Sequence, residues 1–197
     1  MTEATTVNAA DHLLAQARNN AWANRRLLAA CAAVPQEQFS APLGGFFGSL
    51  RATLNHILYV DWYYVDALEG GSLGPAAWRD EEPCKTPADL QREQAAVDHR
   101  LIAFCEGLGD TALGAPVRLI RAGGDRIERA DRVLLHLFQH QIHHRGQAHG
   151  LLSAAGVEPP QLDEFFLNQD RSFRAEELNA LGWQEEELWR AWPAPST

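Results

Sequence analysis

Four long segments of this chain repeat apolar residues at the three- and four-residue spacing of an α-helix, and glycine or proline follows each one. The segments cover about residues 11–34, 46–69, 86–106 and 131–155. Side chains that recur at this spacing share one face of a helix, which must be buried against other helices. Pro35 stops the first segment, because proline cannot continue a helix. The pattern predicts an all-α fold, namely a four-helix bundle.

The residues between these segments predict smaller elements. Thr86 and Pro87 are typical of a helix start, because threonine caps free amides and proline suits the first helical position. The stretches 117–121 and 126–129 flank two adjacent glycines. This arrangement indicates a small β-hairpin before the last bundle helix.

A tail follows the fourth segment and carries short helical patterns. These patterns lie around residues 163–168, 174–180 and 185–192. Three tryptophans, Trp183, Trp189 and Trp192, favour a tail that packs on the bundle rather than a free one. We therefore expect one compact body, with the bundle in residues 1–168 and a short helical extension in residues 169–197.

Charge and hydropathy argue against two classes of partner. The chain has a net charge of −9, and its longest apolar runs fall well short of the roughly 20 residues that cross a bilayer. Arginines between residues 118 and 132 alternate with acidic residues, which is typical of a solvated surface rather than a phosphate-binding face. We expect neither a membrane nor a nucleic-acid partner.

The cysteines point to a cytoplasmic protein. Cys31, Cys84 and Cys105 are far apart and form no paired motif, which favours a reducing compartment and buried, inert thiols. The first ten residues also lack the basic and apolar layout of a secretory signal.

The fourth segment carries a strip of polar side chains within its helical pattern. His136, His140, His143, His144 and Gln147 fall within about 100° of one another around a helix. Apolar residues continue the strip at both ends, so we expect it to face the interior. Buried imidazoles cost free energy unless their nitrogens have partners, and a metal ion is a good partner. The strip therefore predicts a metal site.

His140 and His144 have the spacing that places two ring nitrogens on one ion, as in the zinc-binding HExxH arrangement. Gln141 stands where that motif has its catalytic glutamate, so peptidase chemistry is not supported. Catalytic metal sites commonly use three protein ligands and leave one position open. His56 is our candidate for the third ligand, because it lies in the middle of an apolar helix. The alternative is that His56 is an ordinary hydrogen-bonded core residue.

Two further side chains are candidates to line the pocket beside His136 and His143. Asp61 lies within an apolar stripe and could act as a base or accept a hydrogen bond near the metal. We favour the alternative that it forms a structural salt bridge, to Arg25 or Arg26. Gln147 could bind a metal-bound water, or it could serve as a helix-packing amide.

Three motifs in order resemble the DinB/YfiT-like family of metal-dependent four-helix-bundle proteins. They are NAWANRRLL at residues 20–28, FGSLRATLNHILYVD at residues 47–61 and HQIHHRGQ at residues 140–147. The resemblance implies an up-down-down-up bundle, frequent homodimerisation and a three-histidine site made by His56, His140 and His144. His143 is then a neighbour, and His136 lines the pocket or its edge.

The family resemblance also bears on function. Three neutral imidazoles suit one divalent ion, and zinc, nickel or iron(II) all fit. Relatives that transfer low-molecular-weight thiols make a thiol S-transferase acting on a small-molecule substrate the leading hypothesis. A metal-dependent hydrolase is weaker, because no obvious carboxylate base accompanies the three ligands in the sequence. A non-catalytic metal-binding stress protein and a metal-free helical module are the remaining alternatives.

Overall fold

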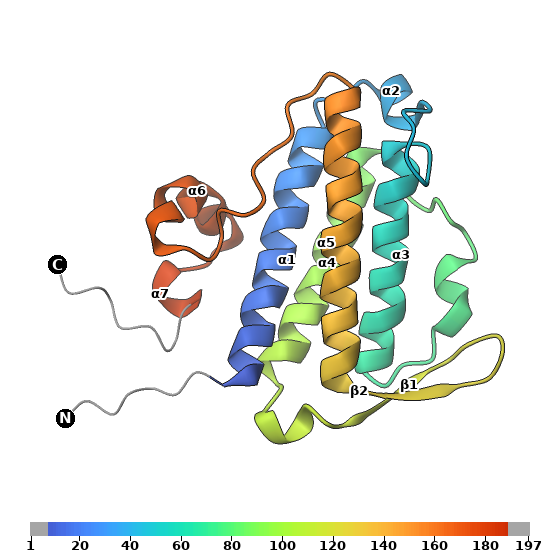
Figure 1. Cartoon of the computed structure of the whole chain (residues 1–197), viewed down its shortest axis with the longest axis vertical. Coiled ribbons are helices and arrows are strands. Elements are labelled where there is room, and N and C mark those ends of the chain that lie inside the picture. Colours follow the sequence, from blue (N-terminus) through green and yellow to red (C-terminus); the bar gives the residue numbers. More distant parts are fainter. Residues whose placement is uncertain (1–7, 189–197) are drawn as a thin grey trace.

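The computed structural model describes residues 8–188, and four long helices dominate it (Figure 1). They are α1 (Ala9–Cys31), α3 (Leu50–Leu68), α4 (Pro87–Glu106) and α5 (Ala130–Ala154). Helices α1 and α3 each pack against both α4 and α5. The mostly helical fold is confirmed. None of the described helices is both long and apolar enough to cross a bilayer.

Shorter elements connect and extend the long helices. They are α2 (Gln36–Ser40), the 3-10 turns η1 (Gly74–Trp78), η2 (Asp110–Ala112) and η3 (Asn168–Asp170), the strands β1 (Pro116–Leu119) and β2 (Arg126–Arg129), and the tail helices α6 (Arg171–Leu181) and α7 (Glu185–Leu188).

The β-hairpin is confirmed, with β1 slightly shorter than expected. The strands are antiparallel, and Pro116 lies opposite Arg129. Val117 and Leu119 are buried, whereas every residue of β2 is exposed. Arg118 pairs with Asp125 at 3.3 Å on the surface, so the mixed charges of this region are solvated as predicted.

Two helix starts differ from their predicted positions. Helix α1 begins at Ala9, because the side chain of Asn8 accepts a hydrogen bond from the Asp11 amide and forms a capping box. Helix α3 begins at Leu50 rather than at residue 46, since Gly48 has a φ of 82° that helical geometry does not allow. The predicted start at Thr86 and Pro87 is confirmed.

The region directly after α1 contains the one-turn helix α2, which the sequence pattern did not predict. A helix of five residues is too short to show a periodic pattern, and its Phe39 is completely buried. The tail differs as well. The predicted helical piece at residues 163–168 consists of bends and a turn up to residue 166, whereas α6 includes the predicted piece at residues 174–180.

The described part of the tail packs on α1. Phe165 and Trp22 are both completely buried, and their ring centroids are 5.5 Å apart. Trp183 is half-buried and packs against the core of the bundle. Trp189 and Trp192 lie outside the described residues. The same surface of α1 carries Arg26. Its guanidinium nitrogens lie 2.7 Å from carboxylate oxygens of Glu164 and Glu177 in the tail.

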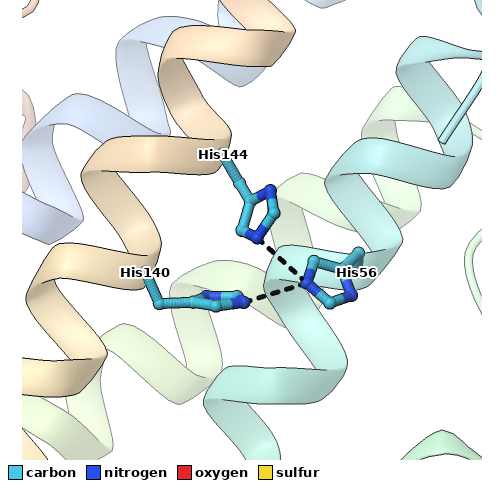
Figure 2. A group of neighbouring side chains, drawn as sticks. All are labelled: His56, His140 and His144. Atoms are coloured by element: carbon cyan, nitrogen blue, oxygen red, sulfur yellow. Dashed lines mark hydrogen bonds between the residues drawn. The ribbon is translucent and has the colours of Figure 1, made fainter. Parts of the chain in front are cut away.

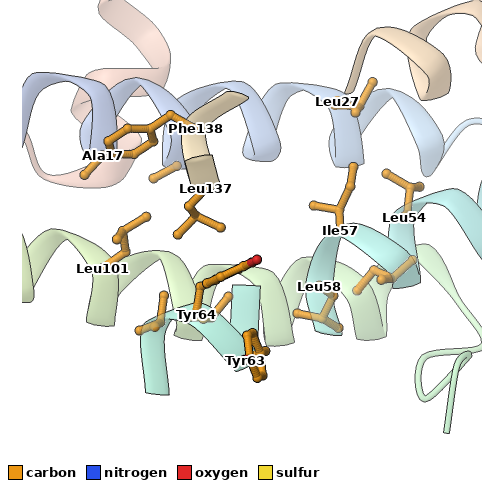
Figure 3. Packing of buried hydrophobic residues seen from close by; sticks show 14 of the residues in the cluster. Ala17, Leu27, Leu54, Ile57, Leu58, Tyr63, Tyr64, Leu101, Leu137 and Phe138 are labelled. Carbon is orange, nitrogen blue, oxygen red and sulfur yellow. The ribbon is translucent and has the colours of Figure 1, made fainter. Parts of the chain in front are cut away.

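Apolar side chains from all four long helices meet in one core (Figure 3). Leu27, Ile57, Leu101 and Leu137, one from each helix, are at most 2% exposed. The three cysteines are free and buried as predicted. Burial raises the pKa of Cys31 to about 12, so this thiol stays protonated and unreactive at neutral pH.

A polar network crosses this core and connects the four long helices. Its side chains are all nine-tenths or more buried: Asn20, Asn24, Asp61, Gln94, Asp98, Gln141 and Arg145. Asp98 accepts hydrogen bonds from both asparagines and from Gln94. A cavity of about 40 Å³, enough for a water molecule, lies beside it.

Asp61 accepts hydrogen bonds from Gln94 and Gln141, and its Oδ1 has no partner among the described residues. The expected salt bridge to Arg25 or Arg26 is therefore wrong. Asp61 lies on the inward face of α3, so its carboxylate points toward α4 and α5 rather than toward Arg25 or Arg26 on α1. The nearest cation in the network is Arg145, which donates to Gln141 at 3.2 Å.

Burial, together with the nearby charge of Asp98, raises the pKa of Asp61 to about 8. The folded chain thus holds a proton on Asp61 at pH values where the unfolded chain has lost it. Asp61 therefore makes the free energy of unfolding decrease as pH rises from about 4 toward 8.

We expect Asp61→Asn to flatten this pH dependence, because asparagine mimics the protonated acid. Urea unfolding at pH 5, 7 and 9 should show the variant at least as stable as the parent chain at pH 9. Asp163→Asn, at an exposed position of the tail, is the control and should leave the profile unchanged. Parallel profiles for Asp61→Asn and the parent would contradict the expectation.

Candidate metal centre

Three histidine side chains converge between α3 and α5 (Figure 2). His56 comes from α3, and His140 and His144 come from α5. The Nε2 atom of His56 lies 2.9 Å from Nε2 of His140 and 3.2 Å from Nε2 of His144. Each residue offers a nitrogen within 4.8 Å of the others. Within residues 8–188 this is the only group of three or more such side chains with a metal-binding arrangement.

Helix packing explains the convergence. His140 and His144 are one turn apart on α5, so their rings point to the same side. On α3, Ile57 and Leu58 follow His56 and are buried in the core, which turns His56 toward the edge of the contact with α5. All three imidazoles are consequently half-buried, with one side toward the core and one toward solvent.

Neighbouring side chains hold two of the rings through their outer nitrogens. Nδ1 of His56 shares a hydrogen bond of 2.6 Å with the Tyr59 hydroxyl. Nδ1 of His144 donates to Oε1 of Gln147 at 2.8 Å. Because an amide oxygen only accepts, Nδ1 of His144 carries the proton and its Nε2 presents a lone pair to the other rings. Nδ1 of His140 is buried and has no partner in the described part of the chain.

The electrostatics keep these imidazoles neutral. Burial, together with the adjacent imidazole rings, lowers the pKa of His56 to about 4 and that of His140 to about 3. Burial also lowers the pKa of His144. Neutral imidazole is the form that binds metal, so the group is ready to bind an ion near pH 7.

The spacing of the nitrogens also fits an ion. Zinc binds histidine at about 2.0–2.1 Å in a tetrahedral arrangement, which separates the ligand nitrogens by about 3.3 Å. The observed distances of 2.9 and 3.2 Å are close to this value. Three neutral nitrogens in such contact need a shared proton or a cation, and a divalent ion satisfies all of them together.

The predicted strip is only partly interior. His136 and His143 are exposed, which contradicts the expectation for these two positions. Both residues lie at the solvent-exposed margin of α5. The ring of His136 packs against that of Tyr64 on α3, with ring centroids 5.2 Å apart. Nε2 of His143 accepts a hydrogen bond of 3.1 Å from the side-chain amide of Gln147. Neither of them is part of the convergent group.

Gln147 and Asp61 have contacts that the sequence did not predict. Gln147 contacts both His143 and His144 and so orients the second ring. Asp61 is brought into the buried network, where it bonds to amides of α4 and α5 rather than to the imidazoles.

Two site residues were missed in the sequence. Tyr59 lies three residues after His56 and therefore on the same side of α3, a spacing that could have identified it. Phe47 stacks on His56, with centroids 4.3 Å apart, and meets His144 edge-on at 5.4 Å. It belongs to an irregular loop whose position no periodic pattern predicts.

Comparison with known proteins agrees with this fold. A family model described as the DinB family matches residues 5–177. Among solved structures, a DinB-like protein from Bacillus cereus ATCC 10987 aligns with a TM-score of 0.56 at 17% identity, over 71% of this chain and 90% of that one. At that identity the likeness shows the fold alone. No curated protein matches the chain.

We expect metal-free protein to lose stability as pH falls from about 6.5 toward 4. In this window the unfolded chain protonates His56 and His140, whereas the folded chain keeps them neutral. NMR titration of the chelator-treated protein should find both rings neutral at pH 5. Ordinary imidazole titration near pH 6.5 at both positions would be inconsistent with the packed site.

Proposed function

Because the chain belongs to the DinB family, we propose that it binds one divalent metal ion through His56, His140 and His144. The observation that carries the proposal is the convergence of three Nε2 atoms from two helices. Three neutral imidazoles suit zinc, nickel and iron(II), and we propose one of these as the ion.

We further propose that the protein is a metal-dependent enzyme. The convergent group contains three histidines, and His136 and His143 are directed elsewhere. A structural zinc site usually has four protein ligands, whereas a catalytic site keeps one position open. The half-exposed rings support an open position on the solvent side. A non-catalytic metal-binding stress protein is the second candidate.

The reaction that we favour is transfer of a low-molecular-weight thiol to a small electrophile. A bound divalent ion would lower the pKa of a thiol and favour its thiolate form. The thiol sulfur forms a bond to an electrophilic carbon, the leaving group departs with its electron pair, and the thiol proton passes to solvent. Tyr59 and Gln147 hold two of the imidazoles in place, and Phe47 covers one side of them.

Metal-dependent hydrolysis is the weaker alternative. A hydrolase needs a base close to the reacting water, and Asp61 was the carboxylate in the sequence that best suited this role. Its hydrogen bonds are made inside the core network. No carboxylate of the described residues joins the convergent group.

The helix order implied by the family resemblance, up-down-down-up, is part of the proposal. Its support is that α1 and α5 begin at the lower end of the bundle in Figure 1, whereas α3 and α4 begin at the upper end. A homodimer, a cytoplasmic location and a small-molecule substrate also remain proposals.

Purified without a histidine tag, the protein should contain close to one divalent ion per chain by elemental analysis. His140→Ala should lose most of it, because removal of one of three ligands weakens binding by at least about tenfold. His149→Ala is the matched control, since His149 is on the same helix but bonds to Pro160. Equal metal content in the parent chain and His140→Ala would refute the three-histidine site.

The metal-loaded protein should accelerate conjugation of at least one thiol with a panel of electrophiles. Glutathione, bacillithiol and mycothiol are the thiols to test, with depletion of free thiol as the readout. His140→Ala should reduce the rate to that of the uncatalysed reaction. No increase in rate with any of the three thiols would refute the transferase proposal and favour the non-catalytic metal-binding stress protein.

A further inference from the structure

An exposed aromatic side chain lies next to the candidate metal centre. Phe46 is 85% exposed, more than any other large apolar residue in the described part of the chain. Its ring packs edge-on against Phe47, with centroids 4.8 Å apart. Phe47 in turn stacks on His56 and meets His144. The two phenylalanines thus form a continuous aromatic surface that leads from solvent to the imidazoles.

The loop that carries Phe46 has a defined shape. The amide of Leu43 donates to the carbonyl of Gly48 at 2.8 Å and closes the loop around the two phenylalanines. Gly44, Gly45 and Gly48 have φ values of 90°, 73° and 82°, which other residues rarely adopt. The closed turn therefore presents Phe46 outward in one place.

The loop also bridges the two helices of the site. A Cβ at Gly45 would lie 3.8 Å from Leu151, which is near the end of α5, while Gly48 is just before α3. The aromatic surface is consequently positioned by both helices that supply the histidines.

The other sides of the site are polar. Gln147 and His143 occupy the α5 side, and the Tyr59 hydroxyl occupies the α3 side. Burial raises the pKa of Tyr59, and the charge of Glu81 adds to this effect, so a negative charge also lies nearby. An apolar group that approaches the imidazoles therefore finds a matching surface on the Phe46 and Phe47 side.

We propose that Phe46 and Phe47 form an aromatic platform that binds the flat apolar part of the substrate. The electrophile then carries an aromatic ring, which stacks on the platform while its reactive carbon lies over the imidazoles. For 1-chloro-2,4-dinitrobenzene, the thiol sulfur bonds to the ring carbon, chloride leaves with the electron pair and the thiol proton passes to solvent. This substrate class rests on the proposed thiol transfer.

The test uses the metal-loaded, full-length chain and a probe that cannot react. 1,3-Dinitrobenzene keeps the ring and nitro groups of such an electrophile but has no leaving group. NMR titration measures its dissociation constant. We expect Phe46→Ser to weaken binding about five- to tenfold, because the variant loses the apolar contact. Metal content should be unchanged, since the ring of Phe46 packs against Phe47 and has no described contact with the imidazoles.

Phe173→Ser is the matched control. Phe173 is 58% exposed and belongs to α6 in the tail. The same substitution there removes an equally apolar aromatic ring, but away from the candidate metal centre. Its affinity for the probe should equal that of the parent chain. Equal weakening in both variants, no weakening in Phe46→Ser, or no binding by the parent chain would each overturn the platform.

This outcome is separable from the failure of the proposed function. If the parent chain holds no metal or transfers no thiol, the proposed function fails, whatever the probe does. If the metal is bound and thiol transfer occurs, but Phe46→Ser binds the probe normally, only the aromatic platform fails.

Discussion

The packing of α3 against α5 is the interaction on which the candidate site depends. His56 contributes from one helix and the other two histidines from the next, so no single segment of the chain contains the site. Ile57 on α3 and Leu137 on α5 are buried in the core that these helices share. Burial of such side chains stabilises the fold by roughly 1.5–3 kcal/mol each, and the same contact sets the spacing of the nitrogens.

Helix α5 carries two kinds of polar side chain on adjacent faces. His140 and His144 face α3 at the edge of the bundle, while Gln141 and Arg145 point into the core and bond to α1 and α3. A rotation of α5 about its axis would break these hydrogen bonds in the core. The same rotation would move His140 and His144 away from His56. The buried network thus gives α5 a unique rotation, which hydrophobic packing alone specifies less sharply.

Much of this arrangement could be predicted from the sequence. Helical periodicity and terminators identified the four long helices, and the i, i+4 spacing paired His140 with His144. The identification of His56 needed the apolar surroundings of α3 and the resemblance of the motifs. The partners of Asp61 were not predictable, because they depend on how α4 and α5 face α3. Phe47 was missed for a related reason, since three glycine conformations determine the path of its loop.

The half-buried position of the histidines has a kinetic consequence. Because the rings lie on the flank of the bundle rather than in its centre, an ion or a small molecule can diffuse to and from them without any opening of the helices. Exchange at such a surface is limited by encounter and by the residence time of the bound molecule, not by a gating motion. The helices can therefore stay rigid while an ion or a small molecule binds at the imidazoles and leaves them.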